Sequence, residues 1–128
     1  MRSQYNPMIV VAVDSKRNTK GQNSLNRMAF REALDRFKVD YQSCVGVYDG
    51  FEERSYMLPY NEAALILAES ALKYYNQECF LVMDNEGRGT LVYKDGLPKV
   101  IGFLETSDEK PKGDYTEVLS TGQYITFK

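Results

Sequence analysis

The sequence predicts an α+β domain of the split βαβ, or ferredoxin-like, type: an antiparallel sheet with two helices on one face and extra C-terminal strands. Three observations lead to this prediction. Apolar runs and helical stripes follow each other in the order strand, helix, strand, strand, helix, strand. Further strand-like segments, separated by turn signals, follow that unit. The length of 128 residues fits one domain, so residues 1–128 are treated as a single unit.

The first half of the chain supplies one helix and three strands. A β-branched apolar run predicts a buried strand, and apolar residues at i, i+3, i+4 and i+7 predict the helix after it. Two alternating segments follow, separated by a turn signal. The elements predicted here are a strand over 8–13, a helix capped by Asn23 or Ser24 and running to Phe37, and strands over 41–49 and 53–58 about Asp49-Gly50.

The second half begins with the strongest helical stripe of the chain and ends in a meander of short strands. A polar segment containing proline and lysine interrupts the meander. The elements predicted here are a helix from Asn61 to Tyr75, strands over 79–83, 90–93, 100–105 and 123–127, and a loop over 106–114.

Composition excludes several classes of function. The net charge is -2, which argues against a sequence-independent nucleic-acid binder, because such proteins need an excess of cations. The chain has no histidine, so histidine-ligated metal sites and catalytic triads are excluded. We also expect no membrane span and no signal peptide, and therefore a cytoplasmic protein. Cys44 and Cys79 are predicted to be buried, reduced thiols.

An antiparallel sheet with helices on one face leaves its other face open. Apolar groups on that face need cover, and a common solution is self-association in a ring. The predicted fold therefore favours an oligomer.

One hairpin combines a tyrosine with two carboxylates. Tyr48 ends one predicted strand and Glu52 and Glu53 begin the next. Strand alternation places the two glutamates on opposite faces, so only one of them can enter a given pocket. A glutamate near a tyrosine hydroxyl can orient a cationic ligand, or act as a base if burial raises its pKa. The alternative, favoured by the pattern alone, is a charged hairpin tip that faces solvent.

The start of the first helix offers a second candidate site. Asn23, Asn26 and Arg27 could bind a carboxylate there, because helix N-termini present free N–H groups. Ordinary capping and a surface arginine are the more usual explanation for such residues.

Four motifs in the same order resemble the phage-encoded S-adenosylmethionine (SAM) lyases, formerly called SAM hydrolases. The resemblance covers nearly the whole chain. The motifs are a valine-rich first strand with the stretch Asn23 to Arg27, Gly46-x-Tyr48 before Glu52-Glu53, Gln77-Glu-Cys79-x-Leu81-Val82, and Leu91-Val-Tyr93 with Gly96.

This resemblance implies a PII-like homotrimer with active sites at subunit interfaces, and no metal or cofactor. It implies cleavage of SAM to 5′-methylthioadenosine and L-homoserine lactone by attack of the substrate's own carboxylate. A phage enzyme of this kind would deplete host SAM in the host cytoplasm and so counter restriction. The alternatives are a non-catalytic PII-like regulator that binds an adenine nucleotide, and a small phage inhibitor acting by protein contact.

The resemblance also assigns residues. Glu53 best matches the family's essential glutamate and would hold the α-ammonium or sulfonium end of the substrate. Tyr48 would orient the reacting group through its hydroxyl. Glu52 is the alternative if the register differs by one residue, and Ser55 and the backbone of the strand from Cys79 to Met83 are predicted to line the pocket.

Overall fold

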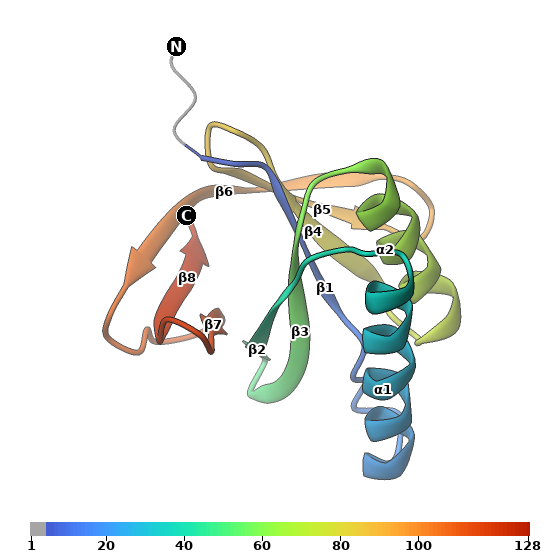
Figure 1. The fold of residues 1–128 in the computed structure, drawn as a ribbon. Coiled ribbons are helices and arrows are strands. Elements are labelled where there is room, and N and C mark those ends of the chain that lie inside the picture. The colour runs from blue at the N-terminus through green and yellow to red at the C-terminus, as the bar shows by residue number, and fades with distance from the viewer. Residues whose placement is uncertain (1–4) are drawn as a thin grey trace.

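The computed structural model describes residues 5–128, whose strands form a closed eight-stranded antiparallel barrel with two helices outside it (Figure 1). Around the barrel the strand order is β1-β3-β2-β7-β8-β6-β5-β4. The strands are β1 Met8–Ala12, β2 Gln42–Tyr48, β3 Phe51–Pro59, β4 Cys79–Met83, β5 Arg88–Tyr93, β6 Pro98–Ser107, β7 Tyr115–Val118 and β8 Gln123–Phe127. The helices are α1 Lys20–Arg36 and α2 Glu62–Tyr74.

The closed barrel shows that the prediction of an open ferredoxin-like sheet with two helices on one face is wrong. Strands β4, β1, β3 and β2 are neighbours in that order, but the sheet does not end at β2 or β4. The four later strands continue it, and β7 pairs with β2 from Cys44↔Val118 to Val47↔Tyr115. Closure turns one face of the sheet into the barrel interior, so the fold lacks the open ferredoxin-like face from which self-association was predicted.

Two apolar layers follow from the alternation of side chains along the strands. Ile9, Val11 and Val13 of the first strand region face the helices, where Phe30 and Leu34 of α1 complete the larger core. The opposite faces of the strands point into the barrel. There Cys44, Val118 and Ile125 form a smaller cluster, with Met8, Met57, Leu104 and Phe127 packed against it. Figure 1 shows both helices on one side of the barrel, with β7 and β8 on the opposite side.

The two helices begin in different ways. The Asn61 side chain accepts a hydrogen bond from the Ala64 N–H at 2.8 Å and caps α2, as predicted. Helix α1 begins earlier than predicted, because Thr19 rather than Asn23 or Ser24 is its N-cap. Asn23 is buried on the inner side of the helix, so its side chain is engaged elsewhere.

The C-terminal meander contains one strand that the sequence did not predict. β7, Tyr115–Val118, directly follows the predicted loop, and it is the strand that closes the barrel. Both cysteines are free, as predicted, but only Cys44 is buried, while Cys79 is half-buried. Within residues 5–128, neither helix is long and apolar enough to cross a membrane.

Candidate functional site

A cavity of about 330 Å³ opens at the end of the barrel where β1 ends, β4 begins and the β2–β3 hairpin turns. This volume lies at the lower end of the range found for small-molecule sites. Strand residues Val10, Ala12, Leu81 and Leu91 form an apolar wall on the barrel side. The residues that follow β1, from Asp14 to Arg17, line the polar mouth. The cavity therefore combines an apolar interior with a charged entrance.

The β2–β3 hairpin delivers three predicted residues, Tyr48, Glu53 and Ser55, to this cavity. Asp49 and Gly50 both have positive φ angles, 50° and 75°, as a two-residue turn between twisted strands requires. Opposite the turn, Gly46 pairs with Glu53. A Cβ at Gly46 would lie only 2.8 Å from Cε2 of Tyr48 and 3.7 Å from Cγ of Glu53. The missing side chain thus lets the Tyr48 ring lie across β2 beside Glu53, which explains the Gly46-x-Tyr48 spacing.

Glu53 is a half-buried carboxylate with no hydrogen-bond or ion-pair partner among residues 5–128. Burial, and secondarily the nearby negative charge of Asp14, raises the pKa of Glu53 to about 7. A carboxyl group in this state gains most from a cationic ligand, because the cation restores the ionised form. Glu53 is thus suited to a positively charged ligand.

Tyr48 is exposed at its ring and enclosed at its hydroxyl. The residue is 42% exposed, but its hydroxyl lies 3.2 Å from Oγ1 of Thr116, a buried residue of β7. Burial of the hydroxyl raises the pKa of Tyr48, and the negative charge of Glu53 adds to this. The tyrosine therefore remains a neutral hydrogen-bonding group at neutral pH.

Ser55 follows Glu53 on the same face of β3 and also lines the cavity. It is 4% exposed, and its Oγ has no hydrogen-bond partner within the described part of the chain. An unpartnered buried hydroxyl is unusual, since most buried polar groups are paired. Ser55 therefore carries an unused donor and acceptor that is enclosed behind the cavity surface.

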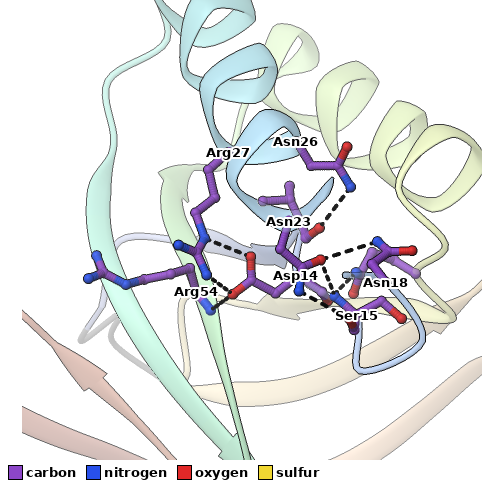
Figure 2. Close-up of polar contacts among 9 residues, drawn as sticks. Asp14, Ser15, Asn18, Asn23, Asn26, Arg27 and Arg54 are labelled. Atoms are coloured by element: carbon purple, nitrogen blue, oxygen red, sulfur yellow. Dashed lines mark hydrogen bonds and ion pairs between the residues drawn. The ribbon is translucent and has the colours of Figure 1, made fainter. Parts of the chain in front are cut away.

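Asp14 is the second carboxylate of the cavity, and it differs from Glu53 in being fully engaged (Figure 2). Arg27 donates to its two oxygens at 2.8 and 2.6 Å in a bidentate ion pair. The backbone N–H of Arg54 donates to the same carboxylate at 2.8 Å. Asp14 is 3% exposed, and this pairing is what allows a charged group to be buried there. The residue fastens β1, α1 and β3 together.

Asn23 and Asn26 fix the turn between β1 and α1 (Figure 2). The Asn23 Oδ1 accepts from the Ser15 N–H at 3.0 Å, and its Nδ2 donates to the Ser15 carbonyl at 3.1 Å. Asn23 also accepts from Asn18, while Asn26 Nδ2 donates to the Val13 carbonyl at 3.5 Å. Asn23 and Asn26, which the sequence suggested as ligand-binding residues, are therefore engaged in hydrogen bonds within the protein.

The structure therefore brings together only part of the predicted set. Tyr48, Glu53 and Ser55 line one cavity. Glu52 is exposed and lies on the opposite face of β3, outside the cavity lining. Asn23 and Arg27 do not line the cavity either, because their polar atoms bind Ser15 and Asp14. The roles assigned to all six residues remain predictions.

Three kinds of polar residue line the cavity although the sequence did not indicate them as site residues. Asp14 is the anchor just described, and Lys16 and Arg17 are exposed cations at the mouth. Gln77, before β4, is 7% exposed and its Nε2 donates to the carbonyls of Asp14 at 2.7 Å and Tyr75 at 3.2 Å. A polar residue directly after an apolar strand or directly before one is the signal that could have indicated them, because such positions lie at the end of a barrel.

Cys79 lines the cavity close to Glu53. Burial raises the pKa of its thiol, and the charges of Glu78 and Glu53 add to the effect. The thiol is therefore protonated and weakly nucleophilic at neutral pH. Across residues 5–128, no group of three or more cysteine, aspartate and glutamate side chains could hold a metal ion.

One comparison with known proteins gives a match. The model of the S-adenosylmethionine lyase family matches residues 9–128, which includes the cavity and both helices. No curated protein matches the chain.

Proposed function

Because the chain belongs to the S-adenosylmethionine lyase family, we propose that it cleaves S-adenosylmethionine into 5′-methylthioadenosine and L-homoserine lactone. Family membership makes the protein an S-adenosylmethionine lyase with S-adenosylmethionine as its substrate. The observation that supports the cavity as the site is the unpaired carboxylate of Glu53 beside Tyr48.

The proposed reaction balances without a proton transfer. A carboxylate oxygen of the substrate attacks its own γ-carbon, and a carbon–oxygen bond forms as the carbon–sulfur bond breaks. The electron pair of the broken bond goes to sulfur, so the sulfonium becomes a neutral thioether. The lactone keeps the α-ammonium, and total charge is conserved. The enzyme's task is thus to hold the substrate in a folded geometry.

Glu53 is proposed to supply the main polar contact. Its carboxylate lacks a cationic partner in the described chain, and the substrate carries two cationic centres, the α-ammonium and the sulfonium. Holding that end beside the Tyr48 ring would fix the methionine moiety against the hairpin, and the Tyr48 hydroxyl is proposed to orient the reacting group. Ser55 is proposed to add a hydrogen bond from deeper in the same wall, for which its enclosed hydroxyl must turn toward the cavity when the substrate binds.

The apolar wall of the cavity is proposed to favour the chemical step itself. In the reacting substrate a negative carboxylate and a positive sulfonium neutralise each other. Water stabilises the separated charges more than the neutralised transition state, so excluding water lowers the barrier. Val10, Ala12, Leu81 and Leu91 supply a surface of this kind.

We further propose a homotrimer with active sites at subunit interfaces. The support from the structure is a set of exposed apolar side chains on and before β6, where Leu97, Val100 and Phe103 are each more than half exposed. Such side chains gain free energy when a neighbouring subunit covers them. Light scattering on the purified protein checks the subunit number, and a monomer would contradict this part of the proposal.

The biological role proposed from the resemblance to phage enzymes is depletion of SAM in the host cytoplasm, which would counter SAM-dependent restriction. Expression in a bacterial host should lower the cellular SAM concentration. An unchanged concentration despite soluble, active protein would contradict this role.

The test of the activity is to incubate the purified protein with SAM and separate the products by chromatography with mass detection. Glu53→Gln should reduce kcat/KM by about 100-fold, because it removes the charge facing the substrate, an electrostatic contribution of a few kcal/mol. Glu52→Gln is the matched control: the same change one residue away, on the opposite face of β3, should leave kcat/KM within about twofold.

Each outcome is informative. Methylthioadenosine with homoserine lactone supports the proposed reaction, whereas homoserine instead of the lactone would indicate attack by water. Intact SAM would contradict the activity and leave a binding protein. Equal loss in both glutamate variants, or full activity in Glu53→Gln, would contradict the assignment of Glu53.

A further inference from the structure

Gln77 lines the cavity, and the nitrogen of its side-chain amide is already engaged. Both of the hydrogen bonds of its Nε2 go to main-chain carbonyls, those of Asp14 and Tyr75. These two acceptors determine which end of the amide is nitrogen, because a carboxamide oxygen could not donate to them. The Oε1 accepts no hydrogen bond within the described chain and is not among its fully enclosed unpartnered atoms. Since Gln77 lines the cavity, the oxygen is the group left for a ligand.

The position of Gln77 separates it from Glu53. Gln77 precedes β4, Asp14 follows β1, and Glu53 lies on β3, and these three strands are consecutive neighbours in the barrel. Two strand spacings amount to about 10 Å between the backbones. The two side chains therefore enter the cavity from strands that are not direct neighbours, so they can contact different parts of an elongated ligand.

We infer that the Oε1 of Gln77 accepts a hydrogen bond from the exocyclic amino group of the adenine base, and so makes the cavity selective for a 6-aminopurine. This inference rests on the proposed function, which supplies the substrate. SAM has N–H donors at its two ends, the α-ammonium and the adenine N6. The charged donor suits the carboxylate of Glu53, and the neutral donor suits the neutral amide.

The wall next to Gln77 fits a purine ring. Along β4 the cavity is lined by Cys79 and Leu81, and Leu91 pairs with Leu81 from β5. The lining residues within β4 and β5 carry no formal charge, and the charged Glu78 lies just before β4. An apolar surface with one fixed polar atom at its edge is typical of sites that bind a flat heterocycle.

The experiment measures binding of 5′-methylthioadenosine and of its 6-deamino analogue by calorimetry, using the intact protein and Gln77→Met. The wild type should bind the adenine ligand about tenfold more tightly, the usual size of one hydrogen bond to a fixed neutral acceptor. In Gln77→Met the two ligands should bind within about twofold of each other. Gln22→Met, the same change at a glutamine outside the cavity, should retain the full preference.

The ratio of affinities separates recognition from a structural role. If Gln77 only holds the chain together through its Nε2, its loss weakens both ligands equally and the tenfold preference persists, which would overturn the inference. Equal binding of both ligands by the wild type, or binding of neither, would also overturn it. The product assay with SAM reports on the proposed function separately, so lyase activity without a base preference refutes only the role of Gln77.

Discussion

The two carboxylates of the cavity lie near each other but in opposite surroundings. Asp14 receives a bidentate arginine and a backbone N–H, and it connects three elements of the fold. Glu53 receives neither a cation nor a hydrogen bond from the described residues, and burial raises its pKa to about 7. The comparison shows how one site divides its polar groups. Those satisfied by the protein maintain the structure, and those left unsatisfied are available to the substrate.

The largest effect should come from removing the satisfied carboxylate. Asp14→Asn leaves Arg27 without its partner, and breaking a buried pair from one side is strongly destabilising. Because the Arg27 side chain is about one third exposed, we expect a loss in the lower part of the usual range, about 3 kcal/mol in the free energy of unfolding. Urea titration measures it.

The contrasting variant sharpens this comparison. Glu53→Gln should keep the wild-type free energy of unfolding or exceed it, because no protein partner is lost. If both variants lost the same amount of stability, the distinction between the two carboxylates would not hold.

The next effect is a pH dependence that belongs to Glu53 alone. Its pKa in the folded protein is about 7, and in the proposed mechanism only the ionised form binds the cationic end of the substrate. We expect kcat/KM to be about half its maximum near pH 7, to level off above that, and to fall about tenfold per pH unit well below it. In Glu53→Gln this acidic limb should disappear. An unchanged limb in the variant would assign it to another group.

The same titration should also affect stability. The pKa of Glu53 is higher in the folded protein than the ordinary value of 4.5, so the folded state binds the proton more tightly. The contribution of this residue to stability is therefore full below pH 4.5 and falls as the pH rises from 4.5 to about 7. A stabilisation of Glu53→Gln over wild type that grows across this interval would support the shifted pKa.

The smallest effect concerns Tyr48. Tyr48→Phe keeps the ring beside Glu53 and removes only the hydroxyl, so we expect kcat/KM to fall about fivefold to tenfold, the value of one hydrogen bond. Thr116→Val keeps the hydroxyl but removes its partner at 3.2 Å, and it should cost less. Steady-state kinetics decide the order. A larger loss in Thr116→Val would mean that the contact with β7, rather than a contact with substrate, is the function of the hydroxyl.

Local patterns predicted the parts of this molecule that depend on neighbours in the sequence. Alternation along β3 separates Glu52 from Glu53, and the structure places only Glu53 in the cavity. The Asp49-Gly50 turn and the Asn61 cap are likewise local signals, each carried by residues within a few positions of one another.

The misses depend on pairs far apart in the sequence. Closure of the barrel requires β7, a four-residue strand whose pairing with β2 spans about 70 positions. Arg27 was considered a ligand-binding residue because its ion-pair partner was not evident from the sequence. That partner, Asp14, lies 13 positions away in another part of the fold. Asn23 was expected to cap the helix. Its hydrogen bonds to Ser15 depend on how the turn between β1 and α1 packs, which the sequence pattern does not show. Neither sequence period nor propensity contains this information.

The pairing of β2 with β7 also affects the order in which parts of the site form during folding. The hydroxyl of Tyr48 contacts Thr116, which lies 68 positions away in the sequence, and the Asp49 N–H donates to Asp114, which lies 65 positions away. Contacts between such distant residues form late during folding, because a long loop must first be closed. The ion pair between Asp14 and Arg27 spans only 13 positions and can form early. The chain should therefore become compact before it becomes active. Local opening of the β2–β7 pairing would abolish activity without unfolding the rest of the protein.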